Sequence, residues 1–424
     1  MADSEDKPKK TPQAEEGHKT VETLQIGGPN AGEESKVVEK KVVPPELPVE
    51  WTKIGEALQD EEALPIRYPE DVAEIDPDEL DVCIVGTAGM KITVMNNDFY
   101  KTCNQNMESL VLRSHLIKSM KGLEGFKRLD LLELYDNQLQ DLSGLEVPGP
   151  NLRVLDMSYN AIRDMSPVSI CVNLKELYLA NNKLKEIKGL KNLKQLKKID
   201  LGANRIRVMD GEELGGLENL EELWIGKNKI EKVEGLEKLT KLRRLDIQSN
   251  RLTQVEGLTA QKDTLEELYL AHNGIDNEGA SLPTGLGLDF TQLNVLDVGR
   301  NRLTSTTPFC HLESIDEIWL SGNNISTWEA IEPFKKACEE GKQKMDTLYL
   351  EYNPIASEFE YRKRLAEWIP TLKQIDATLI GGLAAHGVPA APKPSSDPVI
   401  PLAEEMRQLQ TQVFERAQGE KPNE

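Results

Sequence analysis

A short pattern of leucines and asparagines returns at nearly constant intervals through most of the chain. Each copy reads L-x-L-x-x-N-x-L or carries isoleucine at an equivalent position, and the interval is most often 22 residues, as from Leu177 to Ile199. A period of about 20–29 residues indicates a stacked repeat array. Ten copies are clear, and an eleventh has His115 in place of the asparagine: Leu132–Leu139, Leu155–Ile162, Leu177–Leu184, Ile199–Ile206, Leu223–Ile230, Leu245–Leu252, Leu268–Ile275, Leu296–Leu303, Ile318–Ile325, Leu348–Ile355 and, with the histidine, Leu110–Ile117.

Each position of the pattern has a physical reason. The L-x-L segment predicts a short strand whose leucines point inward and whose middle residue points outward. The asparagine stands where the chain leaves the strand, and its amide can satisfy turn backbone groups that would otherwise be buried without partners. These features predict an α/β repeat fold, a leucine-rich-repeat solenoid with a concave parallel sheet. Units of 22 residues leave room only for 3-10 turns or short helices on the convex side.

The repeats divide the chain into five segments. Residues 109–355 hold the repeats, and residues 356–380 predict a C-terminal cap, with a helix that places Tyr361, Leu365 and Trp368 on one face. Leu372, Ile375 and Leu379 are expected to cover the last open edge. Residues 1–50 are polar and lack periodicity, which predicts a disordered extension. Residues 51–108 are expected to form an N-terminal cap or an irregular segment, and residues 381–424 a linker that leads to a short helix.

Charge and cysteine usage narrow the classes of partner. The formal net charge is −21, whereas binding to nucleic acid requires a basic surface, so no nucleic acid is expected. Such acidity favours basic or mixed-charge protein partners, although it could equally serve only solubility. The five cysteines form no CxxC pair, the first residues lack the apolar core of a signal peptide, and no apolar run is long enough to span a bilayer. The sequence therefore predicts a reducing intracellular compartment and no membrane contact.

The residue between the two strand leucines varies in a regular way. Aromatic residues make up only 5% of the chain, yet they alternate with aspartates at this position from the second to the ninth clear repeat. Large aromatic side chains on an outward surface are typical binding hot spots. We call these residues the central column, and in order they are Glu133, Asp156, Tyr178, Asp200, Trp224, Asp246, Tyr269, Asp297, Trp319 and Tyr349.

The position two residues earlier shares the same face of the sheet. In the alternating repeats each aromatic residue is preceded there by a glutamate: Glu176, Glu222, Glu267 and Glu317. We expect flat anchors surrounded by carboxylates, which would select arginine and lysine on a partner. The alternative is that the aromatic rings only pack against one another along the sheet. Alternation places them about 9–10 Å apart, two strand spacings, which favours binding.

The sequence offers little support for catalysis. It contains no Gly-rich phosphate loop of the GxxxxGK[ST] type and no HExxH motif, and it suggests no cofactor. Its histidines are isolated, and His115 and His272 stand in repeat turns, where a structural role is expected. The ranks of equivalent carboxylates predict a docking surface and not an acid–base pair, whose two members should have different environments. A glycosidase with paired carboxylates is the enzyme alternative.

Several runs of residues resemble the protein phosphatase 1 regulatory subunit 7 family. They are Leu134-Tyr135-Asp136-Asn137-Gln138, Leu245-Asp246-Ile247-Gln248-Ser249-Asn250-Arg251-Leu252, Glu267-Leu268-Tyr269-Leu270-Ala271-His272-Asn273-Gly274-Ile275, Tyr349-Leu350-Glu351-Tyr352-Asn353-Pro354 and Gln374-Ile375-Asp376-Ala377-Thr378. The resemblance covers about residues 109–380.

The resemblance implies a non-catalytic subunit of nucleus and cytoplasm. Such a subunit binds the catalytic subunit of protein phosphatase 1 through its concave face, takes part in phosphatase maturation and mitotic progression, and can work with a third regulatory protein. The family's phosphatase-contacting positions fall on Asp156, Tyr178, Asp200, Trp224, Asp297, Glu317, Trp319 and Tyr349.

The chain also departs from that family. Residues 82–108 do not follow its first repeat, the tail beyond residue 380 is extra, and no [RK]-[VI]-x-F docking segment is present. A different intracellular repeat adaptor, such as a ribonucleoprotein subunit or an axonemal scaffold, is the alternative, because such proteins share the 22-residue unit.

Overall fold

A computed structural model of the chain describes residues 65–95 and 99–380. The predicted extension 1–50, residues 51–64 of the next segment, and the linker and helix of 381–424 lie outside these described residues.

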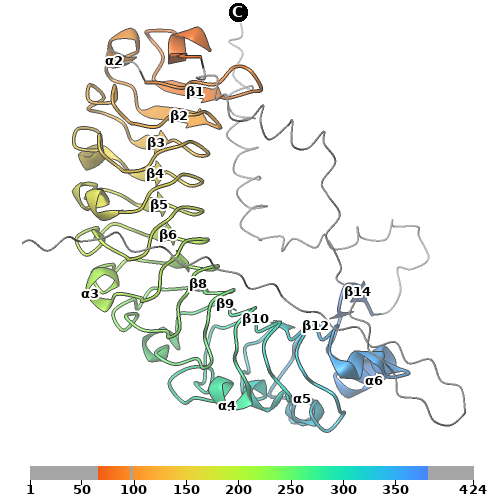
Figure 1. Ribbon diagram of the computed structural model, residues 1–424. Coiled ribbons are helices and arrows are strands. Elements are labelled where there is room, and N and C mark those ends of the chain that lie inside the picture. Colours follow the sequence, from red (N-terminus) through yellow and green to blue (C-terminus); the bar gives the residue numbers. More distant parts are fainter. Residues whose placement is uncertain (1–64, 96–98, 381–424) are drawn as a thin grey trace, which may run out of the picture. The chain divides into compact units, whose positions relative to one another are not determined.

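The described residues form one 14-stranded sheet whose strands follow one another in chain order. All neighbouring strands are parallel except the last pair, β13 and β14. Figure 1 shows these strands side by side along the concave side of the repeats. They are β1 (Asp81–Val85), β2 (Ser109–Arg113), β3 (Leu131–Glu133), β4 (Val154–Asp156), β5 (Glu176–Tyr178), β6 (Lys198–Asp200), β7 (Glu222–Trp224), β8 (Arg244–Asp246), β9 (Glu267–Tyr269), β10 (Val295–Asp297), β11 (Glu317–Trp319), β12 (Thr347–Tyr349), β13 (Gln374–Ile375) and β14 (Thr378–Leu379).

The convex side carries short helical elements, as the repeat length predicts. Most are 3-10 turns or single helical turns, since the chain has few residues with which to return to the next strand. They are η1 (Pro69–Asp71), α2 (Phe99–Thr102), η2 (Gly149–Asn151), η3 (Ser166–Ile170), α3 (Gly211–Leu214), η4 (Thr259–Gln261), α4 (Asn277–Ala280), η5 (Thr307–Phe309), α5 (Glu332–Glu339), η6 (Pro354–Ser357) and α6 (Tyr361–Trp368). The predicted leucine-rich-repeat solenoid is confirmed.

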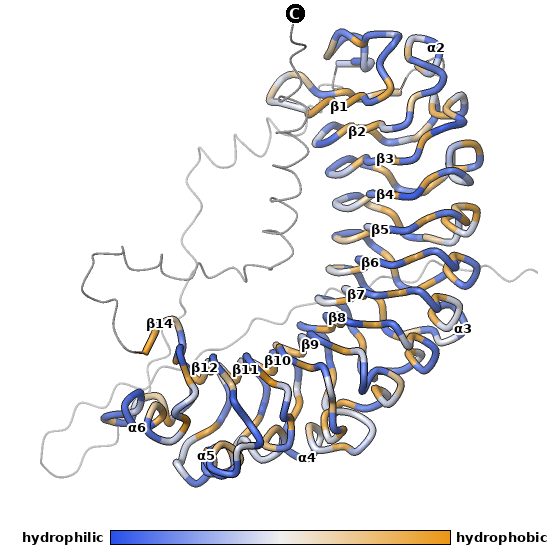
Figure 2. Tube along the Cα trace, turned by 180° about the vertical axis from the view of Figure 1, so that it is seen from behind, coloured by the Kyte–Doolittle hydropathy of each residue, from blue (hydrophilic) through white to orange (hydrophobic). Residues whose placement is uncertain are grey.

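One continuous apolar core runs through the stacked repeats. In the unit that begins at Leu177, seven apolar side chains are at most 1% exposed, and full burial of each contributes about 1.5–3 kcal/mol. Figure 2 shows the same alternation of hydrophobic and hydrophilic stretches in every turn of the chain. The seven are Leu177, Leu179, Leu184, Ile187, Leu190, Leu193 and Leu196.

The asparagines connect each repeat to the one before it. The Nδ2 of Asn228 donates to the carbonyl oxygens of Leu201 (3.0 Å) and Ile225 (3.0 Å), and its Oδ1 accepts from the amide of Ile206 (2.9 Å). Leu201 and Ile206 belong to the preceding repeat, so a single side chain satisfies backbone groups in two turns. The same bonds recur at the equivalent asparagines from Asn137 to Asn353.

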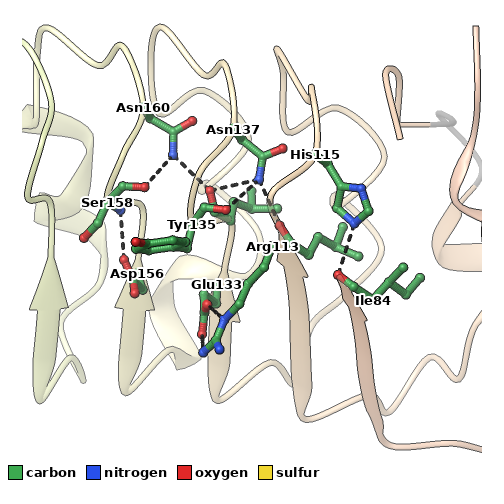
Figure 3. Close-up of polar contacts among 11 residues, drawn as sticks. Ile84, Arg113, His115, Glu133, Tyr135, Asn137, Asp156, Ser158 and Asn160 are labelled. Atoms are coloured by element: carbon green, nitrogen blue, oxygen red, sulfur yellow. Dashed lines mark hydrogen bonds and ion pairs between the residues drawn. The ribbon is translucent and has the colours of Figure 1, made fainter. Parts of the chain in front are cut away.

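Different side chains take over this role at the two ends of the array. His115, 2% exposed, accepts from the amide of Ile92 at Nδ1 (3.1 Å), and its Nε2 lies 3.1 Å from the carbonyl oxygen of Ile84. The expected structural role of His115 is therefore confirmed (Figure 3). At the other end, the Oδ1 of Asp376 accepts from the amides of Leu350 (2.8 Å) and Glu351 (2.9 Å).

The residue before each asparagine has a left-handed backbone that the pattern did not predict. Lys227 has a φ of 52° and Ala203 a φ of 52°, and the equivalent residues of the other repeats agree closely. This conformation costs a non-glycine residue about 1–2 kcal/mol. It turns the chain sharply at the end of the strand, which brings the asparagine under the preceding turn.

The segments on either side of the clear repeats extend the sheet. Residues 65–95 and 99–108 hold η1, β1 and α2, and β1 pairs in parallel with β2, so the stacking begins one strand earlier than the repeat pattern. At the C-terminal end, Tyr361 and Leu365 of α6 are buried, as are Leu372 and Ile375. Leu379 lies in β14, which pairs antiparallel with β13 and covers the last edge of the sheet as expected, although Leu379 itself is 59% exposed.

We expect Asn228→Ala to lower the free energy of unfolding by about 1–3 kcal/mol, because it leaves buried backbone groups without partners. Asn324→Ala, an exposed asparagine in the same region of another repeat, is the matched control and should change it little. Urea unfolding followed by circular dichroism measures both. We call the repeated hydrogen bonds of these asparagines the asparagine ladder. Equal losses of stability in the two variants would contradict its role in joining the repeats.

Candidate functional site: the concave face

The strand register assembles the central column as the sequence predicts. Asp156 pairs with Tyr178, Tyr178 with Asp200, and Asp200 with Trp224, and the order continues to Trp319 and Tyr349. The acidic and aromatic side chains therefore alternate on one surface, one strand apart. The glutamates of the preceding position form a second, adjacent column along the same strands.

The aspartates of the central column are more buried than expected for docking groups. Asp156 is 5% exposed and Asp200 3%. Each aspartate bends back onto its own strand end, where Oδ1 accepts from the amide two residues later: Asp156 from Ser158 (2.8 Å) and Asp200 from Gly202 (2.8 Å). Asp246 and Asp297 make the same bond. A short carboxylate readily forms this local turn, so these residues help to end the strands as well as shape the surface.

Burial changes how these carboxyl groups titrate. Desolvation between neighbouring side chains, reinforced for Asp156 by the charge of Glu133, raises the pKa of Asp156 to about 7. Desolvation likewise raises the pKa of Asp200 to about 7 and that of Asp297 to about 6. The pKa of Asp246 is raised for the same reason. The concave face therefore carries less negative charge near neutral pH than its composition implies.

The aromatic residues differ in exposure along the column. Trp319 is 37% exposed, and its ring stacks on that of Tyr349 with centroids 4.4 Å apart. Trp224 is only 7% exposed, and the Arg244 guanidinium lies 5.8 Å from the centre of its ring. The expectation of an exposed anchor holds at Trp319 and is wrong at Trp224. Within the described column, Trp319 and Tyr349 are the aromatic pair in ring contact, so the packing alternative applies only there.

Three glutamates of the adjacent column hold the aromatic groups in place. The Tyr178 hydroxyl donates to Glu176 (2.8 Å), and the Trp319 indole Nε1 donates to Glu317 (2.6 Å). Tyr269 donates to Glu267 in the same way (2.6 Å). These bonds join residues two apart on one strand.

In the middle of the face the adjacent column contains its own cations. Lys198 lies 3.0 Å from Glu222, Arg244 lies 3.9 Å from Glu222, and Arg244 donates to Glu267 (2.8 Å). Glu222 and Glu267 are therefore paired within the protein. The carboxylates best placed to meet a basic partner lie outside this stretch, and Glu317 is the one beside the exposed Trp319.

The first residue of the central column, Glu133, also has an ionic partner within the chain. The guanidinium of Arg113 forms a two-pronged ion pair with Glu133, with Nη2 2.7 Å from Oε2, as Figure 3 shows. Glu133 is 7% exposed. Glu133 was predicted to belong to the binding face, and its carboxylate already has a partner in the chain.

A third column lies on the same face and was missed by the sequence analysis. It stands two residues after the central column, and most of its members are small. The recurrence of glycine, alanine and serine at one position was the signal that could have found it. Its members from β4 to β11 are Ser158, Ala180, Gly202, Gly226, Gln248, Ala271, Gly299 and Ser321.

The perturbed carboxyl groups do not form a catalytic pair. Perturbed pKa values often mark functional sites. Here, however, Asp156, Asp200 and Asp297 each accept from the amide two residues later, and desolvation is the main cause of each raised pKa. An acid–base pair needs two groups in different environments. Within residues 65–95 and 99–380, no group of histidine, cysteine and acidic residues is arranged to hold a metal ion.

Comparison with family models finds leucine-rich repeats in the middle of the chain. The model described as Leucine rich repeat matches residues 172–230 and 194–252, and a further model of the same description matches residues 262–282. The model described as Leucine Rich repeats (2 copies) matches residues 150–190.

Curated relatives are similar over parts of their length. The protein phosphatase 1 regulatory inhibitor subunit PPP1R7 homolog of Arabidopsis thaliana is 34% identical over 105 residues, 25% of this chain and 32% of that protein. The protein phosphatase 1 regulatory subunit pprA of Dictyostelium discoideum is 35% identical over 69 residues, 16% of this chain and 19% of its own length. The 187-kDa microtubule-associated protein AIR9 of Arabidopsis thaliana is 31% identical over 102 residues, 23% of this chain and 6% of that protein. The aligned segments thus span less than a third of each relative.

Among solved structures, the leucine-rich-repeat protein LIC12759 of Leptospira interrogans has a TM-score of 0.57 at 23% identity, over 67% of this chain and 69% of that one. This likeness concerns the fold. The sheet, the asparagine ladder and the matched repeats together define a leucine-rich-repeat protein.

We expect the free energy of unfolding to fall as the pH rises from about 5 to about 8, by on the order of 1 kcal/mol for each buried aspartate. The folded state of Asp156 and Asp200 holds a proton up to a pKa of about 7, whereas the unfolded chain loses it near its ordinary value. The contribution of these protonated aspartates to stability is therefore complete at low pH. It is lost as the pH rises through their pKa in the folded protein.

The double variant Asp156→Asn with Asp200→Asn is the control, since asparagine keeps the oxygen that accepts from the backbone but does not titrate. Histidines with lowered pKa values, His115 and His272, act in the opposite direction and remain in both proteins. Parallel pH profiles of thermal or urea unfolding for the two proteins would contradict this assignment.

Proposed function

We propose that this chain is a non-catalytic regulatory subunit that binds the catalytic subunit of protein phosphatase 1 through its concave face. In this role it influences the maturation, activity and localisation of the phosphatase. The observation that carries the proposal is the alternating acidic and aromatic column, on a repeat array whose relatives include proteins named as regulatory subunits of this phosphatase.

The C-terminal part of the face offers the strongest anchor. Trp319 is large, partly exposed and held by two contacts, the stack on Tyr349 and the hydrogen bond to Glu317. A ring that is already fixed loses little conformational freedom when a partner covers it. Glu317 adds a carboxylate at the edge of the ring, which suits an arginine or lysine of the partner.

The residues of the central column divide into two roles under this proposal. Tyr178, Trp319 and Tyr349 supply apolar contact area, and Glu317 supplies charge. Trp224, only 7% exposed, adds little area. Asp156, Asp200 and Asp297 are held by their own backbone. A cationic side chain of the partner placed over these aspartates would favour their ionised forms. The partner would then be attracted by negative charges that are partly absent from the unbound face.

We further propose that the chain works in the nucleus and cytoplasm. All five cysteines lie among the described residues, and each is a free thiol, as is usual for proteins of a reducing compartment. No helix within the described residues is long and apolar enough to cross a membrane.

A second candidate is another leucine-rich-repeat adaptor, such as a ribonucleoprotein subunit or an axonemal scaffold. The similarity to a microtubule-associated protein, at an identity close to that of the phosphatase subunits, supports it. Recovery of an RNA-binding protein or a dynein component without phosphatase, in a pull-down with the full chain, would favour this candidate.

We expect Trp319→Ala to weaken binding of the phosphatase 1 catalytic subunit by about 2 kcal/mol or more, which is about thirtyfold in Kd. Phe359→Ala removes an aromatic side chain that is 93% exposed outside the central column and is the matched control. Isothermal titration calorimetry on the purified proteins, with circular dichroism to verify folding, measures both. Equal affinity of the two folded variants would refute the assignment of Trp319.

A further inference from the structure

A second surface lies away from the strands, on the segments that directly follow the asparagine turns. It is a pocket of about 450 Å³ formed by three successive repeats. Its walls include Lys185 and Lys188 of one repeat, Arg205, Arg207 and Val208 of the next, and Lys229 of the third. These positions follow Asn182, Asn204 and Asn228, so the asparagine ladder fixes their spacing as it fixes that of the strands.

The pocket is basic in a protein that is strongly acidic. Five of its nine lining residues are lysine or arginine and two are acidic, whereas the chain as a whole carries a net charge of −21. A local concentration of cations against such a background attracts an anion only at close range, since the surrounding charge repels it at longer distances.

The two acidic residues of the pocket already have partners. Glu186 is ion-paired with Lys188. Asp210 is the N-cap residue of helix α3, and its Oδ1 accepts from the amides of Glu212 (2.9 Å) and Glu213 (3.3 Å). Within the described part of the chain, no ion pair joins Lys185, Arg205, Arg207 or Lys229 to a carboxylate. Four cations therefore face one pocket with their charge uncompensated.

The geometry selects among anionic ligands. Guanidinium groups bind phosphate oxygens in pairs, and lysine ammonium groups add point charges. A carboxylate would bring one charge, whereas a phosphoserine brings about −1.5 to −2 and three acceptor oxygens. A nucleic acid would bring many phosphates toward a chain whose net charge is −21, which disfavours it as the ligand. Val208, 57% exposed at the pocket, offers apolar contact to a residue next to the phosphate.

We propose that this pocket binds a phosphorylated serine or threonine side chain of a peptide segment, with Arg205 and Arg207 holding the phosphate and Lys185 and Lys229 completing its charge neutralisation. The site lies on a different surface from the central column. It therefore stands whether or not the concave face binds a phosphatase, and it would let the protein hold two partners at once.

Fluorescence anisotropy with the full chain tests the site. The probe is a fluorescein-labelled pool of short peptides with one fixed phosphoserine and varied flanks, compared with the same pool carrying serine or glutamate. We expect the phosphoserine pool to bind at least about tenfold more tightly than either. We expect Arg205→Gln with Arg207→Gln to remove this preference.

Arg128→Gln with Arg302→Gln is the matched control, because both arginines are exposed, lie in other repeats outside the pocket and remove the same charge. It should leave phosphopeptide binding within about twofold. Equal binding of the serine and phosphoserine pools, equal losses in the two double variants, or tighter binding of a single-stranded oligonucleotide than of the phosphopeptides would each overturn the proposal.

Discussion

The hydrogen bonds of the asparagines are the interaction on which the whole array depends. Leucines bury apolar area but do not fix where one repeat sits on the next, because apolar contacts have little direction. Each asparagine amide satisfies carbonyl and amide groups of two consecutive turns. Those backbone groups are buried. Leaving one without a partner costs more free energy than a single hydrogen bond contributes on balance. The ladder therefore sets a constant spacing, and every surface column of the protein inherits it.

Much of the fold and the composition of the site could be predicted from the sequence, because both follow from a period. The leucines, the asparagines and the column of alternating residues each recur at fixed positions. The left-handed residue before each asparagine could not be predicted, since positions such as Lys227 and Ala203 have no common side chain. β1 was missed because its unit has Thr87, and not an asparagine, five residues after Val82.

The electrostatics of the face were harder to predict than its composition. The sequence pattern predicts that a carboxylate between two leucines is exposed. Asp156 and Asp200 are instead buried, and each is hydrogen-bonded to the backbone of its own strand end. Glu133 is neutralised by Arg113 from the preceding strand. Burial and partner choice depend on the size and reach of side chains in adjacent repeats, which a one-dimensional pattern does not contain. The same contacts shift the accessible binding area toward Trp319 and Tyr349.

Fixed spacing also lets one scaffold present separate surfaces. The concave face offers aromatic rings held by glutamates. The pocket on the segments that follow the asparagine turns offers four cations without an ionic partner. Because the strands and turns are rigidly stacked, neither surface needs to reorganise when the other is covered, which favours independent binding events.

Hydroxyl-radical footprinting of the full chain, with and without the phosphatase 1 catalytic subunit, tests most directly whether the concave face is the binding surface. Oxidation of Trp319 and Tyr349 should fall strongly in the complex, while that of Phe359 and Val208, which lie outside the central column, should not change. Unchanged oxidation of Trp319 and Tyr349 in a saturated complex would contradict the account.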